Sequence, residues 1–99
     1  MTDLNFTSFL INKLKNDKEF AEEFLKVSLE EYSENANKEE LMLALRHLAT
    51  AKGISKLEKK SGISRNVFYK SLSPKGNPTI DTLLAILKSL NLKMVFKPA

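Results

Sequence analysis

Residues 54–72 read Ile-Ser-Lys-Leu-Glu-Lys-Lys-Ser-Gly-Ile-Ser-Arg-Asn-Val-Phe-Tyr-Lys-Ser-Leu, and no other stretch constrains the fold as strongly. They predict two short helices joined by a tight turn at Gly62, because glycine adopts without strain the left-handed conformation that often follows a helix. Ser64 carries the hydroxyl needed to cap the second helix. Two such helices, the second opening on polar side chains, are typical of a helix-turn-helix that reads DNA.

The first of these helices has an expected N-terminal cap. The Ser55 hydroxyl is placed to accept from a free backbone N–H, and Glu58 follows at the spacing of a capping box. Leu57, Ile63 and Phe68 are spaced to meet in the angle between the two helices. We therefore expect these three side chains to form the core of the pair.

Four side chains remain on the outer face of the second helix: Arg65, Asn66, Tyr69 and Lys70. Arg65 and Asn66 lie in the first turn, the part of a recognition helix that usually reaches base edges. Arginine can bind guanine and asparagine can bind adenine through two hydrogen bonds each. The alternatives are an ordinary solvated first turn and a Tyr69 ring that packs on the edge of the core.

Charge divides the 99-residue chain into two unlike parts. Residues 1–40 contain five Lys and ten Asp or Glu, for a net charge of −5, whereas residues 41–99 contain eleven Lys or Arg and two acids, for +9. A basic part that includes the helix pair suits contacts with nucleic-acid phosphates. The alternative is a set of lysines spread over a solvated surface.

Composition argues against several classes of protein. The chain has no cysteine, so it has no disulfide framework and no thiolate zinc site. We see no apolar run of membrane-spanning length and no secretion signal at the N-terminus, which fits a cytoplasmic location. His47, the single histidine, has no grouped partners, and no pairing of nucleophile and base appears. We expect no enzyme, cofactor, metal or small-molecule substrate.

Helical periodicity accounts for most of the remaining chain. Residues 4–15 are ambiguous between a short helix capped by Thr7 and a partly extended segment. Asp17 is expected to cap a helix that ends near Asn35, with an acidic face that is either solvated or a docking surface. Another helix is expected over residues 38–52, closed by Gly53, and Thr79 is expected to cap the last helix, closed by Asn91.

The C-terminal segment Lys93–Lys97 alternates in a way that predicts a short strand, with Met94 and Phe96 on one face. A lone strand needs a partner in this chain, in a second copy or in another protein. We therefore expect a mainly α fold of five or six short helices and one C-terminal strand. Residues 1–36 would form an acidic helical region, and residues 37–99 a helix-turn-helix core with the strand, within a single compact domain.

The chain also resembles a known family, the addiction-module antidote proteins, which are antitoxins with a lambda-repressor-like (Xre-type) helix-turn-helix. The resemblance is strongest from Leu41 to Leu92. It rests on Ala-Leu-Arg-His-Leu-Ala-Thr-Ala-Lys-Gly at residues 44–53, Tyr-Lys-Ser-Leu-Ser at residues 69–73 and Gly-Asn-Pro-Thr at residues 76–79. It implies a cytoplasmic antitoxin of a type II toxin–antitoxin system. Such a protein neutralises a cognate RelE/ParE-like toxin and, as a homodimer, represses its own operon by binding double-stranded DNA.

Carried onto this sequence, the resemblance implies a recognition helix over residues 64–71. The implied base-reading residues are Arg65, Asn66, Tyr69 and Lys70, and the implied phosphate contacts are Ser55, Lys56, Ser64, Lys75 and Asn77. The family usually has a small residue where this chain has Glu58. A carboxylate near the DNA face would weaken phosphate binding, whereas one bent back to the cap at Ser55 would be harmless.

Two other functions fit the same residues. One is a stand-alone phage-type transcriptional repressor without a toxin. The other is a protein-interaction module whose helix-turn-helix no longer binds DNA, and Glu58 is the residue that favours it.

Overall fold

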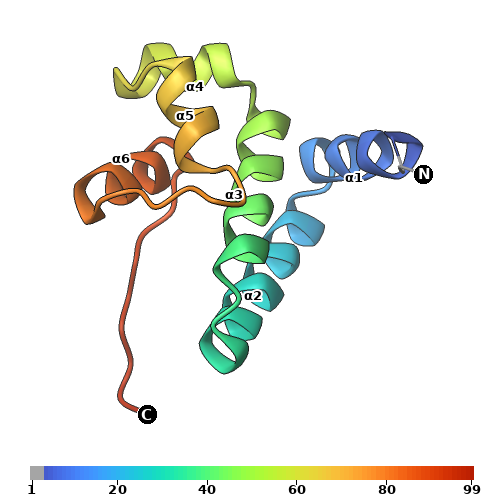
Figure 1. The fold of residues 1–99 in the computed structure, drawn as a ribbon. Helices are drawn as coiled ribbons and strands as arrows, with labels where there is room; N and C mark the ends of the chain where they lie inside the picture. The colour runs from blue at the N-terminus through green and yellow to red at the C-terminus, as the bar shows by residue number, and fades with distance from the viewer. Residues whose placement is uncertain (1–3) are drawn as a thin grey trace.

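The computed structural model describes residues 4–99, and these residues form helices joined by short connections (Figure 1). The helices are α1 (Leu4–Asn16), α2 (Lys18–Asn35), α3 (Lys38–Lys52), α4 (Ile54–Ser61), α5 (Arg65–Ser71) and α6 (Ile80–Ser89). The predicted mainly α fold is therefore confirmed. None of the described helices is both long and apolar enough to cross a membrane.

Side-chain caps explain where several of these helices begin. The predicted caps of α2, α5 and α6 are confirmed: the side chains of Asp17, Ser64 and Thr79 accept from the backbone N–H three residues on, at 3.0, 3.2 and 3.1 Å. The bond from the Phe20 N–H, assisted by the Lys13 side chain, lowers the pKa of the Asp17 carboxyl. Each cap satisfies a donor that the helix itself leaves free.

The ambiguous N-terminal segment is helical. Because α1 already begins at Leu4, Thr7 lies inside the helix and is not its cap. The expected ends of α2 and α3 are close to those observed, with Ala36 in the left-handed conformation after α2 and Gly53 following α3.

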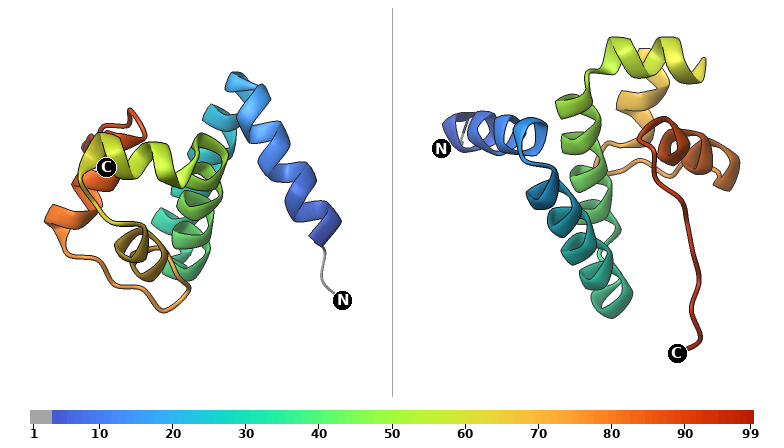
Figure 2. Two further views of the ribbon diagram at one scale, coloured as in Figure 1. Left: turned by 90° about the horizontal axis from the view of Figure 1, so that it is seen from above. Right: turned by 180° about the vertical axis from the view of Figure 1, so that it is seen from behind.

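Helix α3 lies at the centre of the molecule. Helices α1 and α2 pack on one side of it, and α4 and α5 contact it from the other side, with α6 packed on α4 (Figures 1 and 2). Its apolar face supplies the middle of one hydrophobic core through Leu45, Leu48 and Ala49. Phe68, Leu72 and Ile86 are the largest side chains with almost no exposed surface. The core therefore joins α1 and the glutamate-rich helix α2 to the basic part of the chain.

The predicted C-terminal strand is not seen among the described residues. Residues 93–99 leave the helical body as an extended tail (Figure 1) with no ladder of backbone hydrogen bonds. The described residues contain no neighbouring strand that could satisfy the tail's backbone groups, and a strand is not stable alone. The side chains of Val95 and Phe96 are consequently exposed, and that of Met94 is about one third exposed.

Replacing Phe68 by alanine tests the core. Phe68 is only 1% exposed, so Phe68→Ala should lower the free energy of unfolding by about 3–5 kcal/mol through lost burial and a cavity. Urea denaturation followed by circular dichroism measures the change. Phe96, which is 86% exposed, gives the matched control, and Phe96→Ala should leave the midpoint unchanged. Equal midpoints for the two variants would contradict this core.

Candidate nucleic-acid interface

Helices α4 and α5 meet at a tight turn. Gly62 has φ +78° and donates its N–H to the Glu58 carbonyl at 2.9 Å, which ends α4 in the predicted way. Leu57 and Phe68 are buried and Ile63 is partly buried against the same core. The predicted core of the helix pair is confirmed, and it holds α5 firmly on the body of the molecule.

The predicted capping box at the start of α4 is wrong. Gly53 stands at the N-cap position without a side-chain bond, and Ser55 already lies inside the first turn. The Glu58 carboxylate instead accepts a hydrogen bond from the Arg65 backbone N–H at 3.0 Å. Glu58 therefore caps the start of α5 from the neighbouring helix.

This contact changes what the carboxylate does near the outer face. The first N–H groups of a helix have no partner within the helix and carry a partial positive charge. Glu58 satisfies one of them, while Ser64 satisfies another through its bond from Val67. The negative charge is therefore directed into the α4–α5 junction and fixes the position of α5 relative to α4.

The Arg65 side chain is also tied to α4. Its guanidinium group donates a hydrogen bond to the Ser55 hydroxyl. Both side chains are exposed, so solvent or a ligand atom can replace this bond at little cost. The structure thus brings together a predicted base-reading residue and a predicted phosphate contact at the N-terminus of α5.

Tyr69 lies against a residue that the sequence did not single out. The Arg46 guanidinium carbon, on α3, is 5.1 Å from the centroid of the Tyr69 ring, which is a cation–π contact. Of the two expectations for Tyr69, contact with DNA or packing at the edge of the core, the structure shows the ring packed on Arg46 yet still partly exposed. Sequence spacing gave no signal for Arg46, because the contact joins residues far apart in the chain.

The remaining predicted contacts lie on three segments. Asn66 and Lys70 are exposed on α5, Lys56 is exposed on α4, and Lys75 and Asn77 are exposed in the loop that follows α5. The Asn77 side-chain oxygen accepts from the Lys38 ammonium group at 3.5 Å, so it faces the start of α3.

Gly76 holds the loop after α5 close to that helix. A Cβ atom at this position would collide with the Ser71 backbone carbonyl oxygen, so only glycine fits. The Gly76 N–H donates to the Ser73 carbonyl at 2.8 Å, and the Ser73 hydroxyl donates to the Lys70 carbonyl at 3.0 Å. These contacts fix the loop that carries Lys75 relative to the C-terminus of α5.

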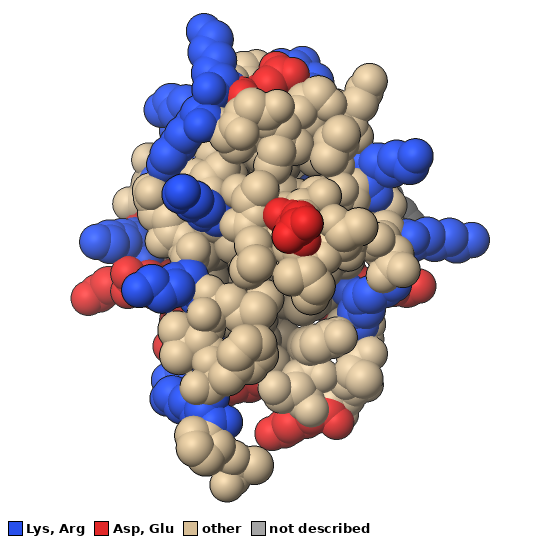
Figure 3. Space-filling model, turned by 90° about the vertical axis from the view of Figure 1, so that its left-hand side faces the viewer, with Lys and Arg blue, Asp and Glu red and all other residues tan. Residues whose placement is uncertain are grey.

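The charge around the α4–α5 pair is strongly positive. Residues 54–77 contain six Lys or Arg and one acid, Glu58, which is bonded to a backbone N–H. Figure 3 shows one side of the molecule, where basic side chains stand around the edges of a largely uncharged surface, with an acidic side chain at its centre and others at the top and the lower edge. Burial, assisted by the charge of Arg46, lowers the pKa of His47. No group of three potential metal ligands occurs in the described part of the chain.

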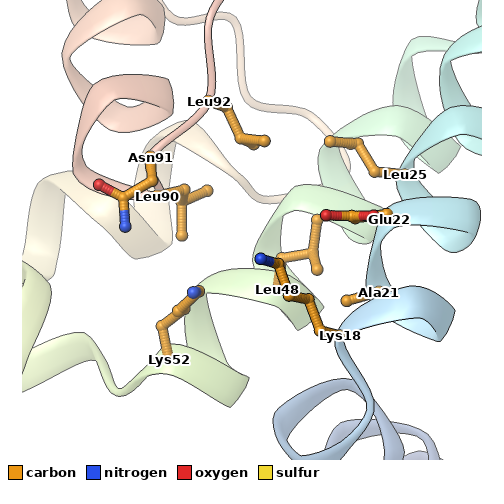
Figure 4. Close-up of a pocket in the computed structure, with 9 residues that line it drawn as sticks. All are labelled: Lys18, Ala21, Glu22, Leu25, Leu48, Lys52, Leu90, Asn91 and Leu92. Atoms are coloured by element: carbon orange, nitrogen blue, oxygen red, sulfur yellow. The ribbon is translucent and has the colours of Figure 1, made fainter.

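A groove of about 650 Å³ lies on another part of the surface, between α2, α3 and the end of α6. Figure 4 shows leucine side chains from these elements around it, with Lys18 and Lys52 also on its walls. Its lining contains no serine, histidine or cysteine. The groove therefore offers an apolar contact surface and not the pairing of a nucleophile with a base.

These features define a small helical protein whose basic part presents a short, capped helix with a polar outer face. The family model described as "Probable addiction module antidote protein" matches residues 5–98. The chain belongs to this addiction-module antidote family, whose name implies an antitoxin with a toxin partner. It is also 38% identical over 73 residues to an uncharacterized protein of Haemophilus influenzae, covering 74% of this chain and 75% of that protein. No solved structure matches.

Substitutions at Glu58 test the cap on α5. Glu58→Ala leaves the Arg65 N–H without its acceptor and should lower the free energy of unfolding by about 1 kcal/mol. Glu58→Gln keeps an acceptor oxygen and should lose less. Urea denaturation of the two variants and the unchanged chain gives the comparison. If alanine and glutamine are equally destabilising, the hydrogen bond is not the reason for the loss.

Proposed function

We propose that this protein is the antitoxin of a type II toxin–antitoxin module and that it represses its own operon by sequence-specific DNA binding. Membership of the antidote family supports the antitoxin role. The observation that carries the DNA-binding role is the capped N-terminus of α5, where Glu58 and Ser64 fix the helix while Arg65 and Asn66 remain exposed.

In this proposal α4 and α5 form a lambda-repressor-like (Xre-type) helix-turn-helix. The basic part of the chain is attracted to the phosphates and sets the orientation, and α5 then reads base edges in the major groove. Arg65 gives up its bond to Ser55 and contacts a base, and Asn66, Tyr69 and Lys70 complete the reading face. The freed Ser55 hydroxyl joins the other phosphate contacts, which are Lys56, Ser64, Lys75 and Asn77.

Glu58 supports this role over that of a module that has lost DNA binding. An unpaired carboxylate on the reading face would repel phosphates, but this one accepts from the Arg65 N–H at 3.0 Å. The same contact keeps the first turn of α5 in place before DNA arrives, which reduces the entropy lost on binding. The phage-type repressor without a toxin shares this DNA mechanism and differs from the proposal only in lacking a partner.

In this proposal the protein acts as a homodimer in the cytoplasm, needs no cofactor and is not an enzyme. Dimeric readers of this class bind half-sites related by a two-fold axis. The extended tail from Lys93 to Lys97 has backbone groups free to pair with the same segment of a second copy. The toxin, a RelE/ParE-like protein, binds elsewhere, through the acidic N-terminal helices.

Arg65→Ala should weaken binding to the operator by about 1–3 kcal/mol and relax the preference for one base pair. Lys75→Ala provides the contrasting variant, because loss of a phosphate contact should weaken all sequences alike and flatten the salt dependence. Band-shift titrations on operator and scrambled DNA at several salt concentrations measure both. An Arg65→Ala protein with unchanged affinity and selectivity would remove Arg65 from the reading face, and a sequence-dependent loss for Lys75→Ala would exclude its phosphate role.

Removing residues 93–99 should convert the dimer to a monomer, since the tail's unpaired backbone would then be missing from the interface. Sedimentation equilibrium measures the mass of the truncated and full-length chains. Circular dichroism is the control, because the tail lies outside the core and helix content should stay the same. A truncated protein that is still dimeric would show that the two-fold contact lies on the helices.

A further inference from the structure

The outer side of α1 and α2 carries apolar side chains without a cover. Helix α2 is 18 residues long, yet none of its side chains is buried. Helices in globular domains gain most of their stability by burying one apolar face. The core packs against only part of this helix, so the rest is free to receive a partner.

On α1 this surface begins with Phe6 and Phe9, which are 62% and 63% exposed. Their spacing from Lys13 places all three on one face of the helix. The Lys13 ammonium group lies 5.5 Å from the centroid of the Phe20 ring. The exposed face of α1 therefore meets α2 at Phe20.

The surface continues along α2 through Phe20, Phe24 and Val27, which recur at helical spacing. The rings of Phe20 and Phe24 are stacked, with centroids 6.3 Å apart, and both side chains pack partly against the hydrophobic core, so that only their outer edges belong to the surface. Val27 is 46% exposed. We call this set of residues, Phe6, Phe9, Phe20, Phe24 and Val27, the α1–α2 strip.

Four exposed carboxylates on α2 border the strip. Glu23, Glu30, Glu31 and Glu34 fall on the same side of the helix as Val27 by their spacing, and all are exposed. Among residues 4–99 the salt bridge found is that between Lys13 and Asp17, at 3.3 Å. The four glutamates therefore have no ion partner within the described chain.

The strip is separated from the proposed DNA-reading helix by the central helix. In Figures 1 and 2, α1 and α2 lie on one side of α3, while α4, α5 and α6 lie on the other. A protein bound to the strip would leave the outer face of α5 open. DNA itself is a poor occupant of the strip, because its phosphates would meet the four glutamates.

We propose that the α1–α2 strip is the docking surface for the toxin, and that it receives apolar side chains flanked by Lys or Arg. This inference rests on the proposed antitoxin function. The acidic border attracts a basic partner, whereas two copies that dock strip to strip would bring their acidic borders together and repel each other.

Paired variants of the strip test the docking surface. The probe is the protein encoded by the reading frame beside this gene, and calorimetric titration measures its affinity. Phe6→Ser with Phe9→Ser removes exposed apolar area, and Glu30→Lys with Glu34→Lys reverses the border charge. Each pair should weaken binding by about tenfold or more. The charge pair should also flatten the dependence of affinity on salt.

Matched controls change exposed residues that belong neither to the strip nor to its acidic border. Glu39→Lys with Glu40→Lys alters the same charge on α3, and Ile80→Ser with Leu84→Ser removes apolar area from α6. Both should bind the probe as the unchanged chain does. All four double variants should keep their helix content, and the two strip pairs should keep their DNA affinity.

The outcomes separate the docking surface from the antitoxin function. An unchanged chain that does not bind its neighbour's product would overturn the antitoxin proposal, and this inference with it. Strip variants that bind the toxin at full strength would overturn the docking surface alone. Strip variants that instead lower the mass of the chain in sedimentation would show that a second copy occupies the strip, which also contradicts the proposal.

Discussion

Burial of the apolar face of α3 is the constraint on which the rest of the structure depends. Ala49 has no exposed surface and Leu45 almost none, because helices that precede and follow α3 in the chain pack against this one helix. Helices α1 and α2 on one side and α4 and α5 on the other would otherwise have no shared core. Area removed from water drives this packing, and it places the glutamate-rich helix α2 and the basic helices α4 and α5 on opposite sides of one small protein.

The second organising contact is the bond from the Arg65 N–H to the Glu58 carboxylate. From its sign alone, a carboxylate near a nucleic-acid-binding face is expected to repel phosphates. The position of the Glu58 carboxylate matters more, since it accepts from a backbone N–H at the N-terminus of α5 that would otherwise need water. Glu58 on α4 thus fixes the position of the proposed reading helix, α5. In this structure the Arg65 side chain donates a hydrogen bond to the Ser55 hydroxyl.

Local patterns predicted the helices well where a cap or a glycine marks the boundary. Asp17, Ser64 and Thr79 act as caps, and Gly62 ends α4 in a left-handed conformation. The capping box of Ser55 and Glu58 failed because α4 starts at Ile54, two residues before the start that a cap at Ser55 requires, which leaves the hydroxyl inside the first turn. The C-terminal strand failed because alternation predicts a pleated surface but cannot supply the neighbouring strand.

The sequence by itself determined the helical class, the charge division between residues 1–40 and 41–99, and the residues available at the candidate DNA interface. These follow from spacing and composition, which are local. Only the tertiary structure decided where Glu58 directs its carboxylate, that Arg46 packs on Tyr69, and that Lys13 of α1 lies over the Phe20 ring of α2. Each of these joins separate helices, and helix packing, which depends on the whole core, sets such contacts.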